Sequence, residues 1–202
     1  MNIAVIIKKI EDKFIYSSDK VLEVGDQIAL SIAVKLREND SFGSSSVSAF
    51  CISPLEHPEA MREALCLGAD NAYFLADALF QKVELDNLMN IFKCAFDTVG
   101  NFDLVLIPAP YKDTMITNLS GQLAKLMNIK HLKDVTNILW QTNKLFYSKV
   151  NSNDFYPLAL PALINISYDP EQKYYNPIRL MKLYRKEVKI LNAEQIGFSI
   201  KT

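Results

Sequence analysis

The sequence predicts an α/β protein with a doubly wound, mostly parallel sheet of about five strands, helices on both faces and an antiparallel, β-rich C-terminal edge. Short apolar runs rich in β-branched residues alternate with longer segments whose apolar residues recur near the helical period. Such runs are typical of strands buried on both faces, and their alternation with helices implies right-handed crossovers. From about residue 130 extended segments replace this alternation.

The elements of the sheet follow one another in the first part of the chain. Strands are expected at residues 3–7, 46–52, 71–75 and 103–107. Helices are expected at about residues 28–36, 58–67, 85–99 and 113–128, the last with Leu119, Leu123, Leu126 and Met127 facing inward. Residues 14–24 are a candidate hairpin, and Gly25-Asp26 punctuates the chain before the first helix. Gly68 stands where a left-handed cap would end the second helix.

The C-terminal part is expected to be strand-rich. Residues 135–147 and 158–168 look extended around a turn at Thr142-Asn143, which predicts antiparallel additions to one sheet edge. The tail, residues 177–190, is expected to hold a short basic helix and a last strand. Because the sequence contains no repeat and no Gly/Ser linker, we expect one domain over residues 1–202, with a core at 1–129 and an extension at 130–202.

Composition excludes several classes of protein. The net charge is −1 and Lys and Arg are spread along the chain, so the basic stripe of a nucleic-acid-binding protein is missing. The apolar run at residues 3–7 is too short for a signal peptide, and the run at 158–166 is interrupted by Pro161 and Asn165. The sequence therefore predicts a soluble, cytoplasmic protein that neither spans a membrane nor binds nucleic acid.

Cysteine and histidine give no sign of a metal site or a disulfide framework. Cys51, Cys66 and Cys94 lack CxxC spacing, so we expect them to be small buried apolar side chains. His57 and His131 adjoin turn-like segments and are expected at the surface. No Ser, His and acid set is spaced for catalysis, and the phosphate motifs GxGxxG and GxxxxGK[ST] are absent.

A ligand site is expected beyond the carboxyl ends of the parallel strands, where loops and helix N-termini converge. The segments that reach this edge are residues 8–9, 24–26, 52–54 and 109–120. In the last, hydroxyls and an amide open a helix, whose N–H groups and partial positive charge suit a phosphate. The simpler alternative is that Asp113 is the N-cap of that helix and the other polar residues are its first turn.

Several segments carry recognisable motifs in order along the chain. They are NIAVIIKKI at residues 2–10, the first helix up to KLRE at 35–38, EAMREALCLGAD at 59–70, FDLVL at 102–106, LPAL at 160–163 and the basic segment at 180–186. Together they resemble the electron transfer flavoprotein beta subunit, particularly its FixA-type branch, whose corresponding motifs include REALAMGAD, FDLVL, LPAV and IMKAKKK. The resemblance extends over nearly the whole chain.

The resemblance implies an adenine-nucleotide alpha-hydrolase-like fold and an electron carrier subunit with no catalytic residue of its own. It also implies pairing with an alpha subunit, or a homodimer in its absence, and an adenine nucleotide, AMP or FAD. Carried over by position, the nucleotide contacts would be Ile6, Lys8, Asp26, Ile52, Asp113, Thr117, Asn118, Ser120 and Gln122. A recognition loop for partner dehydrogenases would include Lys173, Tyr174, Tyr175, Pro177 and Ile178, with Pro177 at the anchor position.

The chain departs from the family motifs at the expected nucleotide loop. The DxDxGQxG pattern corresponds to residues 113–120, where Met115, Thr117-Asn118 and Ser120 replace the second Asp, the Gly-Gln and the last Gly. Glu23-Val24 replaces an Asn-Pro, and a carboxylate there would repel a phosphate. Family members usually continue beyond the position of Thr202 into an arm around the alpha subunit. The alternative function is a divergent adenine-nucleotide-binding or protein-binding relative without flavin chemistry.

Overall fold

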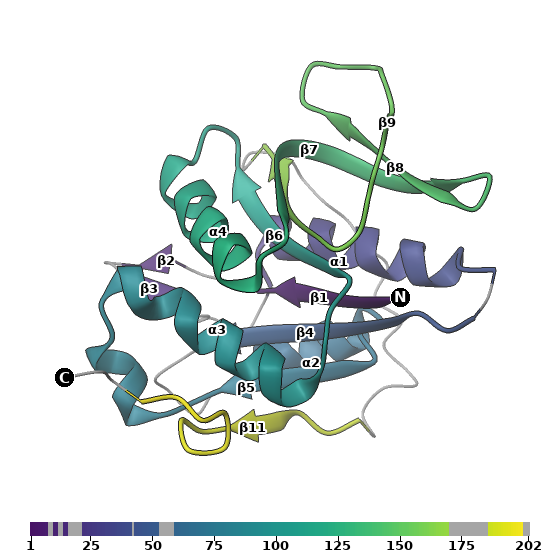
Figure 1. The fold of residues 1–202 in the computed structure, drawn as a ribbon. Coiled ribbons are helices and arrows are strands. Elements are labelled where there is room, and N and C mark those ends of the chain that lie inside the picture. The colour runs from purple at the N-terminus through teal and green to yellow at the C-terminus, as the bar shows by residue number, and fades with distance from the viewer. Residues whose placement is uncertain are drawn as a thin grey trace.

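A computed structural model describes residues 1–7, 10–11, 14–15, 22–41, 43–52, 59–169 and 186–199. Its main feature is a nine-stranded sheet in the order β11-β5-β4-β1-β6-β10-β7-β8-β9. Figure 1 shows α3 and α4 on one side of this sheet and α1 and α2 on the other. The doubly wound α/β fold predicted from the sequence is therefore confirmed.

The bounds of the elements are as follows. The sheet contains β1 (Asn2–Ile6), β4 (Ser46–Ile52), β5 (Asn71–Leu75), β6 (Leu104–Pro110), β7 (Lys130–Gln141), β8 (Lys144–Lys149), β9 (Tyr156–Pro157), β10 (Ala162–Tyr168) and β11 (Lys189–Leu191). A separate antiparallel pair joins β2 (Ile10–Glu11) to β3 (Phe14–Ile15). The helices are α1 (Val24–Glu38), α2 (Glu59–Cys66), the 3-10 helix η1 (Ala78–Lys82), α3 (Leu85–Val99) and α4 (Thr114–Met127).

Each face of the sheet has its own apolar core because residues alternate between the faces along a strand. In β1, Ile3 and Val5 pack under α1 and α2, whereas Ala4 and Ile6 pack under α3 and α4. All four side chains are buried, which explains why β1 reads as a continuous apolar run. The strand pairs in parallel with β4 on one side and β6 on the other.

The helices largely follow the predicted apolar patterns. In α4, Leu119 and Leu123 are buried as expected, but Leu126 is 45% exposed, so its expected inward position is wrong. The helix ends at Asn128, which has a left-handed φ of 54°. At the other side of the sheet, α1 begins at Val24, so Gly25 and Asp26 lie in its first turn and do not precede it.

The C-terminal part contains both the expected hairpin and a difference from the expectation. Thr142 and Asn143, with positive φ, turn β7 into its antiparallel partner β8. However, β10 does not join the edge as an antiparallel strand, because it lies between β6 and β7 and is parallel to both. Its residues from Ala162 to Ser167 are buried, and a strand buried on both faces belongs in the interior of a sheet.

Candidate functional site

The direction of the crossovers changes between β1 and β6. The connection after β1 leads to α1 on one face, and the connection after β6 leads to α4 on the other. In open α/β sheets, ligands bind in the crevice at such a switch point, beyond the carboxyl ends of the strands. We call this region the rim; it comprises the carboxyl ends of β1, β4, β6 and β10 and the N-termini of α1 and α4.

The ends of β1 and β4 bring only the backbone of Ile6 and Ile52 to the rim. Ile6 and Ile52 were expected to contact a nucleotide, but their side chains are 1% and 2% exposed and pack in the core beneath α3 and α4. Lys8, another expected contact, lies outside the described residues. The expected partner-binding residues also lie outside them: Lys173, Tyr174, Tyr175, Pro177 and Ile178.

The N-terminus of α4 is satisfied by its own side chains. Asp113 is the N-cap, because its Oδ1 accepts a hydrogen bond of 2.9 Å from the backbone N–H of Ile116. The Thr117 hydroxyl donates to the carbonyl of Asp113 at 2.7 Å. Asn118 is exposed. The cap interpretation of Asp113 is therefore confirmed, and the Thr117 proton is used within the helix.

Ser120 points into the interior and takes part in a polar chain that sequence reasoning missed. Its hydroxyl donates to Ile116 O at 2.7 Å and accepts from Asn165 Nδ2 at 2.8 Å. Asn165 Oδ1 lies 2.6 Å from His131 Nε2, so the chain links α4, β10 and β7. His131 is half-buried, contrary to its expected surface position, and burial lowers its pKa. Gln122 Oε1 is buried and has no hydrogen-bond partner among the described residues.

The N-terminus of α1 is in contact with Tyr168, at the end of β10. A β-carbon added at Gly25 would lie 2.3 Å from Tyr168 Cε1 and 2.4 Å from its Cζ, so only glycine permits this contact. Asp26, in the same helical turn, is 3% exposed. Burial, followed by the nearby carboxylates of Asp26, Glu23 and Asp113, raises the pKa of the Tyr168 phenol above its ordinary value.

The structure thus brings two of the expected site residues, Asp26 and Asp113, near one tyrosine that was not expected. The sequence signal for Tyr168 was weak: an aromatic residue ends an apolar run that was expected to lie at an antiparallel edge. Its position at the rim follows from β10 lying beside β6, where Tyr168 pairs with Pro110.

The described residues of the rim do not fit a phosphate group. Proteins bind phosphate with N–H donors and cations, but the backbone N–H groups of Tyr111 and Asp113 donate to Tyr168 O and Pro110 O. Among the described residues, the carboxylates of Asp26, Glu23 and Asp113 act on the Tyr168 phenol, whereas the Nζ of Lys112, between β6 and α4, lies 5.3 Å from the centroid of the Tyr111 ring. In addition, the Tyr168 ring covers Gly25 at the N-terminus of α1.

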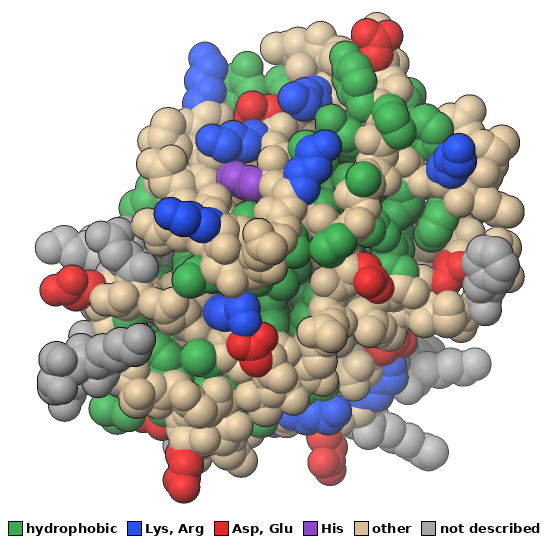
Figure 2. All heavy atoms as spheres, viewed as in Figure 1, with side chains coloured by type: hydrophobic (Ala, Val, Ile, Leu, Met, Phe, Trp, Pro, Cys, Tyr) green, Lys and Arg blue, Asp and Glu red, His purple; other side chains and the backbone are tan. Residues whose placement is uncertain are grey.

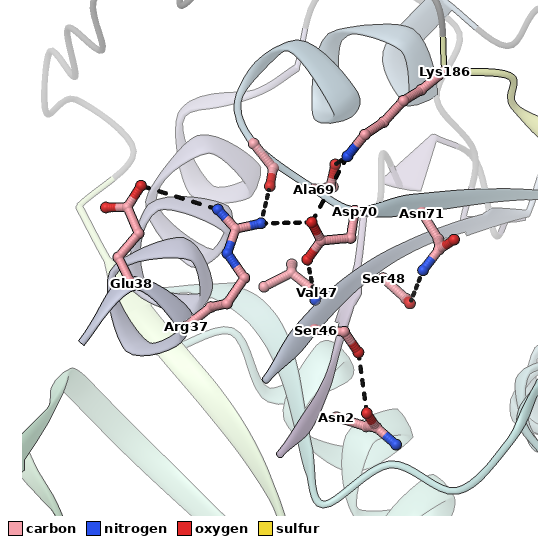
Figure 3. A network of polar contacts seen from close by, with 11 residues as sticks. Asn2, Arg37, Glu38, Ser46, Val47, Ser48, Ala69, Asp70, Asn71 and Lys186 are labelled. Carbon is pink, nitrogen blue, oxygen red and sulfur yellow. Dashed lines mark hydrogen bonds and ion pairs between the residues drawn. The ribbon is translucent and has the colours of Figure 1, made fainter. Parts of the chain in front are cut away.

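The motif EAMREALCLGAD at residues 59–70 ends with Asp70, which lies at the opposite end of the sheet and has a structural role (Figure 3). Asp70, just before β5, accepts hydrogen bonds from the Val47 backbone at 2.9 Å and from Arg37 Nη1 at 2.8 Å. Arg37 Nη1 also donates to Gly68 O at 2.7 Å, and Lys186 Nζ lies 3.7 Å from Asp70 Oδ1. These contacts tie the C-terminal end of α1 to the starts of β4 and β5.

The family assignment follows from comparison with known proteins. The model of the electron transfer flavoprotein domain matches residues 14–153. The chain belongs to the electron transfer flavoprotein family. The resemblance to a beta-type subunit is therefore confirmed, and the fold described above is in keeping with that domain.

Individual relatives are distant but cover most of the chain. The chain is 24% identical to the electron transfer flavoprotein subunit beta of Thermoanaerobacterium thermosaccharolyticum, over 97% of this chain and 80% of that protein. It is 23% identical to the caffeyl-CoA reductase-Etf complex subunit CarD of Acetobacterium woodii, over 89% and 69%. It is 22% identical to the electron transfer flavoprotein subunit beta of Mycobacterium leprae, over 98% and 82%.

The described residues offer neither a metal site nor a membrane-spanning helix. They contain no group of three or more His, Cys, Asp and Glu side chains placed to hold a metal ion. None of the helices in the same residues is both long enough and apolar enough to cross a membrane. Cys51, Cys66 and Cys94 form no disulfide; Cys51 is buried as expected, whereas Cys66 and Cys94 are only half-buried.

Proposed function

We propose that this chain is the beta-type subunit of a two-subunit electron transfer flavoprotein in the cytoplasm, of the FixA-type branch. It pairs with an alpha-type subunit, and the pair passes electrons between dehydrogenases and an acceptor. The observation that carries the proposal is the family match over residues 14–153, together with alignments to beta subunits over almost the whole chain. A homodimer is the proposed state where no alpha-type subunit is present.

The visible surface supports a role in protein binding. Apolar side chains gather over the β7–β9 part of the molecule, whereas Lys and Arg are scattered on the same face (Figure 2). The exposed apolar residues there include Phe155 and Tyr156, which are 45% and 39% exposed, and Leu160, which is 38% exposed. Contiguous apolar surface on a soluble domain commonly marks an interaction site.

The family role includes an adenine nucleotide, AMP or FAD. Because the described residues of the rim do not fit a phosphate, the proposed function does not require a nucleotide bound at the rim. A redox group would then be carried by the alpha-type partner, and this chain would contribute the binding surface and the orientation of the pair.

Co-expression with the alpha-type subunit of the same organism tests the proposal. A tag on this chain is expected to retain that subunit in a one-to-one complex, measured by size-exclusion chromatography with light scattering. The complex is expected to show a flavin absorption spectrum that is bleached by a dehydrogenase and its substrate. A colourless chain that remains alone or self-associated in the presence of the alpha-type subunit would contradict the proposal.

The contact between Tyr168 and Gly25 favours a second candidate function. In this alternative the chain is a protein-binding relative that has lost flavin chemistry. It too would retain a protein partner, but the complex would be colourless and would not accept electrons. The flavin spectrum of the purified complex therefore separates the two candidates.

A further inference from the structure

The N-terminus of α1 is a place where a phosphate would ordinarily bind. The first N–H groups of a helix lack partners within the helix and carry a partial positive charge. At α1 the N-cap residue, Glu23, makes no side-chain capping hydrogen bond. A glycine in the first turn, Gly25, would let a ligand approach the backbone closely.

The group that lies against Gly25 is the side chain of Tyr168, which belongs to this chain. The Tyr168 ring lies against Gly25 so closely that Cε1 and Cζ are within 2.4 Å of the position of a β-carbon. The backbone of Tyr168 is fixed by the parallel pairing of β10 with β6 and by the hydrogen bond of 2.9 Å from Tyr111 N to Tyr168 O. The sheet therefore fixes the point from which the Tyr168 side chain extends over Gly25.

The charges at the rim also replace those of an anionic ligand. The buried Asp26 carboxylate lies in the first turn of α1 and balances the positive end of that helix. Asp113 does the same as N-cap of α4. Both carboxylates, with that of Glu23, act electrostatically on the Tyr168 phenol. Among the described residues, a phosphate beside the Tyr168 phenol would meet the carboxylates of Asp26, Glu23 and Asp113, and like charges at close range repel.

We infer that Tyr168 determines the specificity of this rim: its ring occupies the position where the phosphate of an adenine nucleotide would meet α1, and the chain binds neither AMP nor FAD there. The inference rests on the family role of the rim in the proposed function. It does not depend on whether the alpha-type partner is bound, because every residue that carries it belongs to this chain.

The first experiment uses the purified full-length chain. Mass spectrometry after denaturation is expected to detect no AMP or FAD released from it, and calorimetric titration with AMP is expected to give a Kd weaker than about 1 mM. Release of either nucleotide in amounts equal to the protein would overturn the inference. So would a Kd for AMP in the micromolar range.

The second experiment tests the position of the ring. Tyr168→Ala leaves a ring-shaped space beside Gly25, and a small aromatic molecule can bind in such a space. Phenol at millimolar concentration is expected to raise the thermal midpoint of Tyr168→Ala. It is expected to leave the wild type and the control Leu126→Ala unchanged, because Leu126 is 45% exposed on α4. A Tyr168→Ala protein that folds but does not respond to phenol would overturn the inference. Should it not fold, the nucleotide experiment on the wild type still decides.

These outcomes are separate from those of the proposed function. If the tagged chain retains an alpha-type subunit and also releases AMP, the proposed function stands and the inference about Tyr168 fails. If the chain retains no partner and releases no nucleotide, the inference stands and the proposed function fails. For complexes that contain flavin, the nucleotide measurement is repeated on this chain after separation of the two subunits.

Discussion

At the scale of single residues, the contact between Gly25 and Tyr168 fills the rim beside the first turn of α1. Alanine is a better helix former than glycine by about 0.5–1 kcal/mol, so Gly25→Ala would stabilise α1 if space allowed. The Tyr168 ring leaves no such space. We therefore expect Gly25→Ala to destabilise the protein by about 1–3 kcal/mol, the usual effect of overpacking, measured by urea denaturation.

A double-mutant cycle distinguishes this contact from a general effect of the substitution. In a Tyr168→Ala background the clash is absent, and Gly25→Ala is expected to be neutral or stabilising. Gly121→Ala in α4 is the matched control, because its β-carbon would lie at an ordinary 3.4 Å from His131 Nδ1. Additive effects of Gly25→Ala and Tyr168→Ala would show that the two side-chain positions do not touch.

The Tyr168 phenol also gives a prediction for alkaline pH. Its pKa is raised in the folded protein by burial and by Asp26, Glu23 and Asp113. A group with a raised folded-state pKa stabilises the fold fully below its unfolded-state pKa, and this stabilisation is lost as pH rises toward the folded-state value. The ordinary tyrosine pKa is about 10. As the pH rises from about 9 to about 11, the wild type is therefore expected to lose more stability than Tyr168→Phe. Equal losses in urea titrations of the two proteins would contradict this.

At the scale of the elements, Asp70 connects α1 to the starts of β4 and β5. Asp70→Asn would turn an amide N–H₂ or a neutral oxygen toward the part-buried Arg37, which would keep its hydrogen bond to Gly68 O but lose its carboxylate partner. We expect a loss of about 1–3 kcal/mol in the free energy of unfolding. Glu38→Gln is the control, because the Glu38 side chain is exposed and its Oε1 is as far as 4.0 Å from Arg37 Nη2. The prediction fails if the two variants unfold at the same urea concentration.

Elements whose pattern is local could be predicted from the sequence. The bounds of α3 agree with the expected residues 85–99, because its apolar residues follow one helix face and Gly100 ends it. The position of β10 could not be predicted in the same way. Whether an apolar run lies at an edge or between two strands depends on pairing with β6 and β7, which are distant in sequence.

The candidate site shows the same limit more strongly. Asp113 could be predicted as a helix cap because a cap is a local feature. The Tyr168 contact could not, because it requires both the interior position of β10 and the packing of α1 against it. The direction of Ser120 likewise depends on Asn165, a residue 45 positions away. Family motifs identified the segments of the rim but not the orientation of their side chains.

At the scale of the whole molecule, stability is expected to decrease from the middle of the sheet toward β9. β1 is paired on both sides and its Ile3 and Val5 are fully buried, whereas β9 comprises two exposed residues that pair only with β8 in the described sheet. Amides with few buried neighbours exchange through local opening, and those of a central strand exchange only on global unfolding. Hydrogen exchange measured by mass spectrometry is therefore expected to be slowest in β1 and β6 and fastest in the β8–β9 hairpin.

If an alpha-type subunit covers the apolar surface of Phe155 and Tyr156, exchange in this hairpin should slow in the complex while β1 stays unchanged. Protection of β8 and β9 equal to that of β1 in the isolated chain would show that the hairpin is part of the same cooperative unit.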